Sequence, residues 1–359
     1  MKAGIVGLPN VGKSTLFNCL SNAKAQSANF PFCTIEPNIG VVNVPDNRLV
    51  VLEKLVNPER VLPATVDIVD IAGLVRGASK GEGLGNQFLG NIRETDAIIH
   101  VLRCFENDNI VHVDTTIDPV RDKETIDFEL QLKDLESLDK KLEKVKKTAR
   151  TGNKEAQKEL EVLEKVKIGL ESAISVRGIE LTEKEREEYV KPLQLLTDKP
   201  VLYVCNVDEK SAVNGNKFVD AVKNSIKNEN AEIIVLAVAT EADINELESF
   251  EERQLFLEDL GLEESGAAVL IRAAYKLLNQ QTYFTAGVKE VRAWTINIGD
   301  TAPQAAGVIH TDFEKGFIRA EVIAYNDFVH YGSEAKVKEA GKMRVEGKEY
   351  MAKDRRAHV

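Results

Sequence analysis

Residues 5–14 read Ile-Val-Gly-Leu-Pro-Asn-Val-Gly-Lys-Ser, which places Gly7, Gly12, Lys13 and Ser14 in the spacing G-x-x-x-x-G-K-[ST]. An apolar run precedes the motif and an amphipathic stretch follows it, so we expect a loop between a buried strand and a helix N-terminus. Backbone N–H groups of such a loop surround phosphates, the lysine reaches the β- and γ-phosphates, and the serine hydroxyl binds Mg²⁺. The stretch predicts a nucleotide-binding loop made by Asn10, Val11, Gly12, Lys13, Ser14 and Thr15.

The composition describes a soluble globular protein of two or three domains. The chain has 359 residues, of which 43% are hydrophobic and 29% are charged. We find no apolar run long enough to span a membrane, and we therefore expect no membrane association. The four cysteines lack the spacing of a metal site, which favours reduced thiols and a cytoplasmic location.

The charge is negative overall and uneven along the chain. A net charge of −11 argues against broad nucleic-acid binding, and we expect no DNA partner. From Lys276 onward there are 13 Lys and Arg against 11 Asp and Glu, which leaves 34 against 47 in the rest of the chain. A mildly basic C-terminal region is compatible with a local RNA contact.

Strand-like runs indicate an α/β nucleotide-binding domain with a mainly parallel sheet. They lie at 3–6, 64–71, 97–102, 200–206 and 233–239, and they are apolar enough to be covered on both faces. Between them, Leu135, Leu138, Leu142, Val145 and Ala149 are spaced three, four, three and four. A turn at 151–153 follows, and Leu160, Leu163, Leu170 and Ile174 are expected on a second helix.

This pattern predicts an antiparallel helical hairpin, a short coiled coil, inserted within the α/β domain. It is equally compatible with a solvated structural insertion and with an arm that docks a partner. Short alternating stretches after residue 275 predict a small β-rich domain, for example at 292–297 and 316–323. The expected domains are therefore 1–127 with 199–275, the insertion 128–198, and the C-terminal domain 276–359.

Three residues outside the loop have the chemistry of a triphosphate site. Asp70 ends the strand-like run 65–69, so its carboxylate is expected beside Mg²⁺. Gly73 follows, and its backbone approaches the γ-phosphate because no side chain intervenes. Thr34 lies in a loop after the first helix, and its hydroxyl is a candidate third protein ligand of Mg²⁺. The predicted metal ligands are thus Ser14, Thr34 and Asp70.

The sequence Asn206-Val207-Asp208-Glu209 stands where a domain of this strand order contacts the base. In the common guanine-reading motif Asn-Lys-x-Asp, the carboxylate accepts two hydrogen bonds from guanine. Here Val207 replaces the lysine and Glu209 is one methylene longer than aspartate. A mispaired base edge costs about 1–3 kcal/mol, enough to change nucleotide choice. We predict that Asn206, Val207 and Glu209 bind the base and disfavour guanine.

Four stretches together carry a resemblance to a known family. They are residues 7–14, residues 29–38 (Asn-Phe-Pro-Phe-Cys-Thr-Ile-Glu-Pro-Asn), residues 70–89, which begin Asp-Ile-Ala-Gly-Leu-Val-Arg-Gly, and Asn-Val-Asp-Glu at 206–209. The chain resembles the YchF type of Obg-like ATPase, a subfamily of the translation-factor-related P-loop GTPases. The resemblance implies a P-loop domain with an inserted helical hairpin and a C-terminal TGS domain. It also implies Mg²⁺-dependent ATP hydrolysis and association with a ribosome or ribosomal subunit.

The residue that activates the attacking water is not given by the usual motif. Related GTPases place a glutamine directly after the glycine that corresponds to Gly73, and here that position is Leu74. His112 lies in a loop-like segment, 105–113, and the family resemblance implicates it in hydrolysis. The predicted catalytic residues are therefore His112, Lys13 and Gly73. An imidazole suits this role near neutral pH, whereas a surface-loop histidine without function is the alternative.

Three further alternatives remain at this stage. A GTPase of the same architecture differs at residues 206–209. A nucleotide-gated binding protein, in which hydrolysis is incidental, is favoured by Leu74. Cys33, beside Thr34, is either a small apolar residue or a thiol whose oxidation responds to nucleotide state.

Overall fold

The computed structural model describes residues 1–22, 35–36, 39–71, 84–112, 116–229, 231–353 and 356–358. The chain forms two compact units, each assembled from segments far apart in the sequence. Of the described residues, the first unit contains 1–22, 36, 39–40, 68–71, 84–112, 116–229 and 231–267, and the second contains 35, 41–67, 268–353 and 356–358. None of the helices in the described ranges combines the length and apolar character that crossing a membrane requires.

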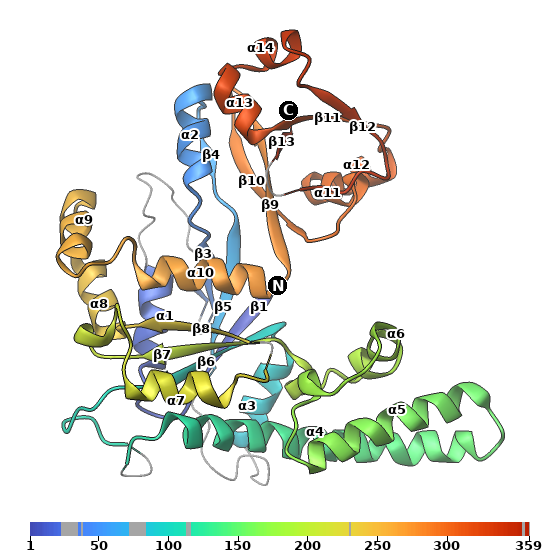
Figure 1. Ribbon diagram of the computed structural model, residues 1–359. Helices are drawn as coiled ribbons and strands as arrows, with labels where there is room; N and C mark the ends of the chain where they lie inside the picture. The colour runs from blue at the N-terminus through green and yellow to red at the C-terminus, as the bar shows by residue number, and fades with distance from the viewer. Residues whose placement is uncertain are drawn as a thin grey trace. The chain divides into compact units, whose positions relative to one another are not determined.

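A seven-stranded sheet carries the nucleotide-binding motifs (Figure 1). Its order is β2-β3-β5-β1-β6-β7-β8, and β1, β6, β7 and β8 pair in parallel. All residues of β6 and β7 are buried, as expected for central parallel strands with covered faces. The strands are β1 (Lys2–Val6), β2 (Ile35–Glu36), β3 (Ile39–Asn43), β5 (Thr65–Asp70), β6 (Ala97–Arg103), β7 (Val201–Asn206) and β8 (Glu232–Leu236). The predicted α/β fold with a mainly parallel sheet is confirmed.

The helices of the first unit are α1 (Lys13–Asn22), α3 (Leu84–Arg93), α7 (Lys217–Ser225), α8 (Val238–Glu246) and α9 (Phe250–Asp259), and α10 (Gly266–Leu277) begins in this unit and continues into the second. The strand expected at 233–239 was too long, because Val238 already begins α8. Glu241 of α8 is buried and its carboxylate accepts the backbone N–H groups of Gly266 and Ala267, at 2.7 and 3.1 Å. It thereby satisfies free N–H groups at the start of α10.

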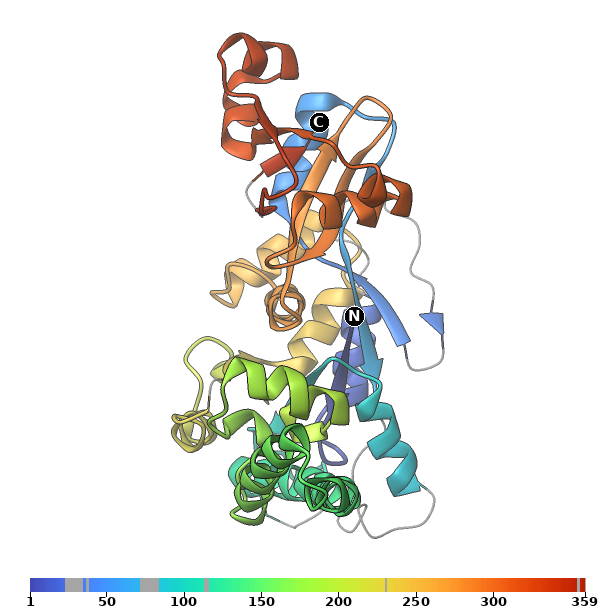
Figure 2. The ribbon, with the colours of Figure 1, turned by 90° about the vertical axis from the view of Figure 1, so that its right-hand side faces the viewer.

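The predicted helical hairpin consists of α4 (Pro119–Ala149) and α5 (Lys154–Glu171). Figure 2 looks nearly along it, so the two helices are seen as adjacent coils. Asn153 caps α5 by accepting the N–H of Ala156 at 3.0 Å. The expectation that Ile174 lies on the second helix is wrong, since α5 ends at Glu171 and Ile174 is 47% exposed.

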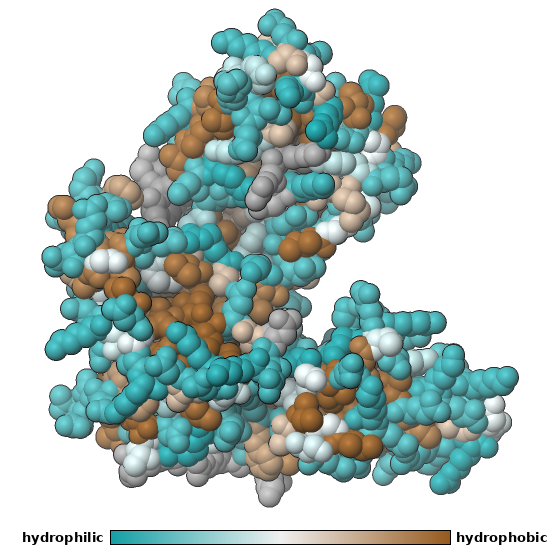
Figure 3. Space-filling model, in the orientation of Figure 1, coloured by the Kyte–Doolittle hydropathy of each residue, from teal (hydrophilic) through white to brown (hydrophobic). Residues whose placement is uncertain are grey.

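The hairpin has a hydrophobic core that includes the segment leading back to the sheet. Leu138, Leu142 and Val145 of α4 and Leu163 and Val166 of α5 pack with Val176, Ile179, Val190 and Leu195 of that segment. The segment also contains the short helix α6 (Glu183–Glu185). Figure 3 shows mainly hydrophilic side chains over the hairpin, with hydrophobic ones gathered toward α6. The hairpin is thus more than two paired helices, because its return segment completes the core.

The second unit is built on a six-stranded sheet of order β12-β11-β13-β9-β10-β4. The strands are β4 (Val61–Leu62), β9 (Gln280–Ala286), β10 (Val291–Asn297), β11 (Ala320–Ala324), β12 (Arg344–Glu346) and β13 (Arg356–His358). The helices are α2 (Asn47–Val56), α11 (Ala302–Ile309), α12 (Thr311–Lys315), α13 (Tyr325–Tyr331) and α14 (Glu334–Glu339). The strand expected at 292–297 is β10, whereas the one expected at 316–323 is shorter and begins at Ala320.

Residues 41–67 belong to this second unit, although the sequence places them between nucleotide-binding motifs. Strand β4 pairs in parallel with β10, and the Arg48 guanidinium lies 4.8 Å from the centre of the Phe284 ring. The N–H of Val291 donates to the carbonyl of Arg60 at 3.0 Å. The two compact units therefore do not coincide with the three predicted domains, whose boundaries stay a prediction.

Candidate functional site

The phosphate loop joins β1 to α1, as its motif predicts. Gly12 has φ +99°, and a Cβ there would lie 2.5 Å from the Asn206 amide nitrogen. A Cβ on Gly7 would lie 2.6 Å from the carbonyl oxygen of Val101. Both positions exclude a side chain, and Gly12 also requires a backbone conformation that glycine tolerates best. The motif glycines are therefore explained by the local geometry.

Lys13 is the first residue of α1 and is 8% exposed. Its Nζ donates to the carbonyl oxygen of Leu8 at 2.8 Å, within the same loop. Burial lowers the pKa of Lys13, and the nearby Asp70 carboxylate opposes this effect without cancelling it. A buried ammonium held against its own loop is well placed to bind the anionic phosphates of a nucleotide.

Ser14 and Asp70 converge at the end of β5. The Ser14 hydroxyl lies 3.4 Å from Asp70 Oδ2, and Oδ1 of the same carboxylate is buried without a hydrogen-bond partner in the described part of the chain. Burial raises the pKa of Asp70, although Lys13 and the Ser14 hydroxyl pull it down. Hydroxyl and carboxylate oxygens are the ligands that Mg²⁺ prefers. This pair therefore fits the predicted magnesium site, whose third ligand, Thr34, lies outside the described residues, as does Gly73.

Asn206 lies at the end of β7 and connects the phosphate loop to the start of α8. Its Nδ2 donates to the carbonyl of Val11 at 2.9 Å, and its Oδ1 accepts the N–H of Val238 at 3.1 Å. Both polar groups of this buried side chain are used, so Asn206 braces the loop. The side chain of Val207 is buried, while Glu209 is exposed and begins a single helical turn. The base-contacting roles of these residues stay a prediction.

His112 is buried rather than displayed on the surface. Its Nε2 lies 2.8 Å from Oδ2 of Asp122, in the first turn of α4, and the two side chains are 3% and 1% exposed. The preceding residue, Val111, accepts a hydrogen bond through its carbonyl from Nδ2 of Asn10 at 3.2 Å. Asn10 belongs to the phosphate loop and has φ +61°. His112 is therefore next to a residue that contacts the phosphate loop directly.

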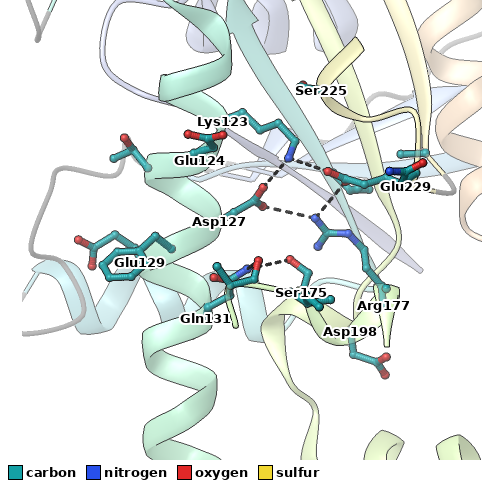
Figure 4. A pocket seen from close by; sticks show the side chains of 18 of the residues that line it. Lys123, Glu124, Asp127, Glu129, Gln131, Ser175, Arg177, Asp198, Ser225 and Glu229 are labelled. Carbon is teal, nitrogen blue, oxygen red and sulfur yellow. Dashed lines mark hydrogen bonds and ion pairs between the residues drawn. The ribbon is translucent and has the colours of Figure 1, made fainter. Parts of the chain in front are cut away.

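A groove of about 1170 Å³ runs along the first part of α4 and is also lined by the start of β7 and by the connection between α7 and β8. Figure 4 shows Lys123 and Asp127 of α4 pointing toward Arg177 and Glu229. Lys123 pairs with Asp127 at 3.0 Å and with Glu229 at 2.6 Å, and Arg177 Nη2 lies 3.4 Å from Asp127. The Tyr203 hydroxyl donates to Glu229 at 2.8 Å. These contacts join the hairpin to strand β7 through buried charges.

His100 of β6 lies behind this cluster. It is 2% exposed and its ring centre is 5.6 Å from that of Tyr203. Burial lowers the pKa of His100 to about 4, and Asp127 opposes that effect. The imidazole is therefore neutral at pH 7, which fits a side chain buried within the sheet.

Comparisons with known proteins place the whole chain in one family. A "Ribosome-binding ATPase YchF" of Haemophilus ducreyi is 58% identical over 98% of this chain and 96% of its own length, and one of Bacillus subtilis is 54% identical over 99% and 97%. The chain belongs to the YchF family. The solved structure of the Schizosaccharomyces pombe YchF GTPase covers 100% of this chain and 97% of its own, with 39% identity and a TM-score of 0.90.

Two family models match separate parts of the chain. A model described as "50S ribosome-binding GTPase" matches residues 2–154, and the YchF-GTPase C-terminal model, a "protein of unknown function", matches residues 280–356. The first match spans the phosphate loop, Asp70, His112 and all of α4. The chain is therefore a P-loop protein of the GTPase superfamily with a YchF-type C-terminal region, as the sequence motifs predict.

Sequence reasoning missed three features of the site. It did not identify Asp122 as the partner of His112, nor Asn10 as a link to the His112 segment. It also missed Arg103, which is buried and donates to the carbonyls of Phe105, Asn107 and Ile110 at 3.3, 3.0 and 2.9 Å. A signal for Asp122 existed only in part, since Asp118-Pro119 marks the start of α4 and places an acid in its first turn.

Proposed function

We propose that this chain is a cytoplasmic, Mg²⁺-dependent ATPase that binds ribosomes and uses its nucleotide state as a switch. The observation that carries the proposal is the phosphate site, in which Lys13, Ser14 and Asp70 converge and Asn206 braces the loop. The name of the relatives at 54–58% identity, "Ribosome-binding ATPase YchF", supports ATP as the nucleotide and the ribosome as the partner. The predicted C-terminal TGS domain at 276–359 and the predicted domain boundaries are part of the same proposal.

In this mechanism the loop binds the triphosphate and the strand end holds the metal. Backbone N–H groups of residues 10–15 surround the phosphates, and Lys13 neutralises charge on the β- and γ-phosphates. Ser14, Asp70 and Thr34 would hold Mg²⁺, which supplies charge neutralisation for the transferring phosphoryl group. Gly73 contributes its backbone near the γ-phosphate.

We assign His112 to the hydrolytic step. Support comes from the Asn10–Val111 hydrogen bond, which ties the segment carrying His112 to the phosphate loop. An imidazole either holds the attacking water or accepts its proton, and a positioned acid–base group contributes about 10²–10⁴-fold. His112→Ala should lower the single-turnover rate by at least about tenfold. Binding of a non-hydrolysable ATP analogue should change little, because the expected loss is confined to the chemical step.

Base selection gives the sharpest test against a GTPase of the same architecture. ATP should bind more tightly than GTP, since Glu209 and Val207 replace the residues that read guanine. Replacing Val207 with Lys and Glu209 with Asp together should raise GTP affinity relative to ATP by about tenfold or more, from hydrogen bonds worth about 1–3 kcal/mol. The measurement is competition of each nucleotide against one fluorescent analogue. Equal dissociation constants for ATP and GTP in the native protein would refute the proposed preference.

Ribosome binding is tested by co-sedimentation with ribosomes and separated subunits in the presence of ATP, ADP or a non-hydrolysable analogue. We expect binding that depends on the nucleotide. Ribosomes should also raise the steady-state rate of ATP hydrolysis. Nucleotide-dependent binding without any rate increase would favour the alternative of a nucleotide-gated binding protein in which hydrolysis is incidental.

A further inference from the structure

The contact between His112 and Asp122 has the chemistry of an oriented imidazole. An ionised carboxylate only accepts hydrogen bonds, so an ionised Asp122 assigns the proton of the 2.8 Å contact to His112 Nε2. In a neutral ring this leaves the lone pair on Nδ1. Such a partner fixes which ring nitrogen carries the proton and how the ring is turned.

The Asp122 carboxylate is itself held in place. Its Oδ2 faces His112, and its Oδ1 accepts from Arg121 Nη2 at 3.1 Å. The Arg121 guanidinium also donates to the hydroxyl of Thr116 at 2.9 Å and to its carbonyl at 2.6 Å. Two partners on opposite oxygens fix the plane of the carboxylate, and its burial keeps water from competing for either contact.

The segment before His112 is fixed from two further sides. Arg103 holds three carbonyls between Phe105 and Ile110, and Asn10 of the phosphate loop holds that of Val111. The backbone of this segment and the side chain of His112 are therefore set by separate contacts. Asp122 contacts the imidazole itself, through the 2.8 Å hydrogen bond at Nε2.

We propose that Asp122 is a positioning residue for hydrolysis, because it fixes the proton and the orientation of the His112 ring. The inference rests on the proposed role of His112 and extends it. Asp122 acts through His112 and is not expected to touch the nucleotide. Its removal should therefore slow the chemical step without weakening ATP binding.

The test compares Asp122→Asn, His112→Ala and the double variant in single-turnover ATP hydrolysis, with titration of a non-hydrolysable ATP analogue. We expect D122N to lower the rate by about tenfold or more, with the dissociation constant of the analogue within about twofold of the native value. The double variant should be no more than about threefold slower than H112A, because two residues that act as one unit are not additive. Asp122→Glu keeps an acceptor-only carboxylate and should be faster than D122N.

The matched control is Asp118→Asn, the same chemical change one helical turn earlier. Asp118 is the exposed cap of α4, and asparagine is an equally good cap, so D118N should hydrolyse ATP within about twofold of the native rate. Nitrogen-15 chemical shifts of the His112 ring give a readout without hydrolysis. The native protein should show Nε2 protonated and Nδ1 unprotonated, and D122N should show a mixture.

The outcomes separate this inference from the proposal beneath it. A native rate in H112A would overturn the role of His112 and, with it, that of Asp122. A slow H112A together with a native or faster D122N would overturn the positioning role alone. A double variant in which the two losses of rate multiply would also overturn the positioning role. The same holds if the proton distribution of the His112 ring is the same in D122N as in the native protein.

Discussion

Two buried lysine–aspartate sets in the first unit have opposite electrostatics. Lys13 and Lys123 are 8% and 6% exposed, so both are removed from water to a similar degree. Burial lowers the pKa of Lys13 and raises that of Asp70, and the neighbouring opposite charges do not reverse either shift. Burial acts in the same directions on Lys123 and Asp127, but there the ion pairs outweigh it, so the pKa of Lys123 is raised and that of Asp127 is lowered.

The contacts explain the difference. Lys13 donates to a backbone carbonyl, and Asp70 receives a 3.4 Å contact from Ser14. Lys123 pairs with two carboxylates, and Asp127 receives contacts from Lys123 and Arg177. Charges that are buried without full compensation mark a site whose ligand supplies the missing partner, whereas charges compensated by one another mark structure. The following variants test this distinction.

The largest expected effect is on hydrolysis, at Lys13. Lys13→Ala removes the ammonium that faces the phosphates and should lower the steady-state rate of phosphate release from ATP by about a thousandfold or more, similar to the loss of a cationic transition-state group. The fold should survive, because Lys13 makes no ion pair with any residue in the part of the chain that the structure describes. The control Lys140→Ala changes a 71%-exposed lysine of the hairpin and should leave the rate unchanged. A K13A protein with near-native turnover would show that this loop is not the active site.

The next effect is on the stability of the fold, at the ion pairs that Asp127 makes near the start of α4. Asp127→Asn leaves Lys123 and Arg177 sharing Glu229, and breaking a buried ion pair from one side costs about 2–3 kcal/mol of unfolding free energy. The thermal midpoint at pH 7 should fall by several degrees, while the dissociation constant of the ATP analogue should stay within about twofold. An unchanged midpoint would mean that the cluster is dispensable for structure.

The direction of the Asp127 pKa shift predicts how the destabilisation of D127N depends on pH. The pKa of Asp127 in the folded state lies below its unfolded value of about 3.9, so its ion pairs stabilise the fold above that pH. The contribution disappears as pH falls toward the folded-state pKa. The difference in thermal midpoint between native protein and D127N should therefore be constant from pH 7 to 5 and shrink below about pH 4.

The sequence could predict that Lys13, Ser14 and Asp70 lie together, because the information that places them is local. Lys13 and Ser14 are fixed by a motif eight residues long, and Asp70 follows from the rule that adjacent parallel strands end at one edge. The base contact of Asn206 stays a prediction, whereas its hydrogen bonds to Val11 and Val238 could not be predicted, because they depend on three chain segments meeting. Asp122 could not be predicted as the partner of His112, because the pairing requires α4 to begin where the segment after β6 returns.

Outside the seven-stranded sheet, too, only elements with a local sequence pattern could be predicted. The hairpin was predicted from the spacing of Leu135 to Ala149, since a helix repeats its pattern within a few turns. Strand β4 has two residues, Val61 and Leu62, which is too short to carry any periodic signal. Its pairing with β10 places residues 41–67 in the second unit, and no sequence pattern predicts a pairing between residues 230 positions apart, Val61 and Val291. The helices α11 and α13 were likewise overlooked in a region expected to be β-rich.

The smallest effect completes the comparison, since the same change, aspartate to asparagine, should act differently at Asp70. The pKa of Asp70 is raised in the folded state, so its negative charge costs stability once pH exceeds the unfolded value of about 3.9. Asp70→Asn removes that cost but also removes the Coulomb attraction that Lys13 feels, so in the absence of nucleotide and Mg²⁺ the two changes nearly offset. The thermal midpoint of D70N, measured with a chelator at pH 7, should be unchanged or slightly higher, within about 2–3 °C of the native protein. As pH falls toward 4, the midpoint of the native protein should rise relative to that of D70N.

Added Mg²⁺ and ATP analogue should raise the midpoint of the native protein and of D127N by similar amounts, and that of D70N by less, because the lost carboxylate is a proposed metal ligand. If D70N instead loses as much stability as D127N without any ligand, Asp70 is a structural charge like Asp127, and the distinction between the two sets fails.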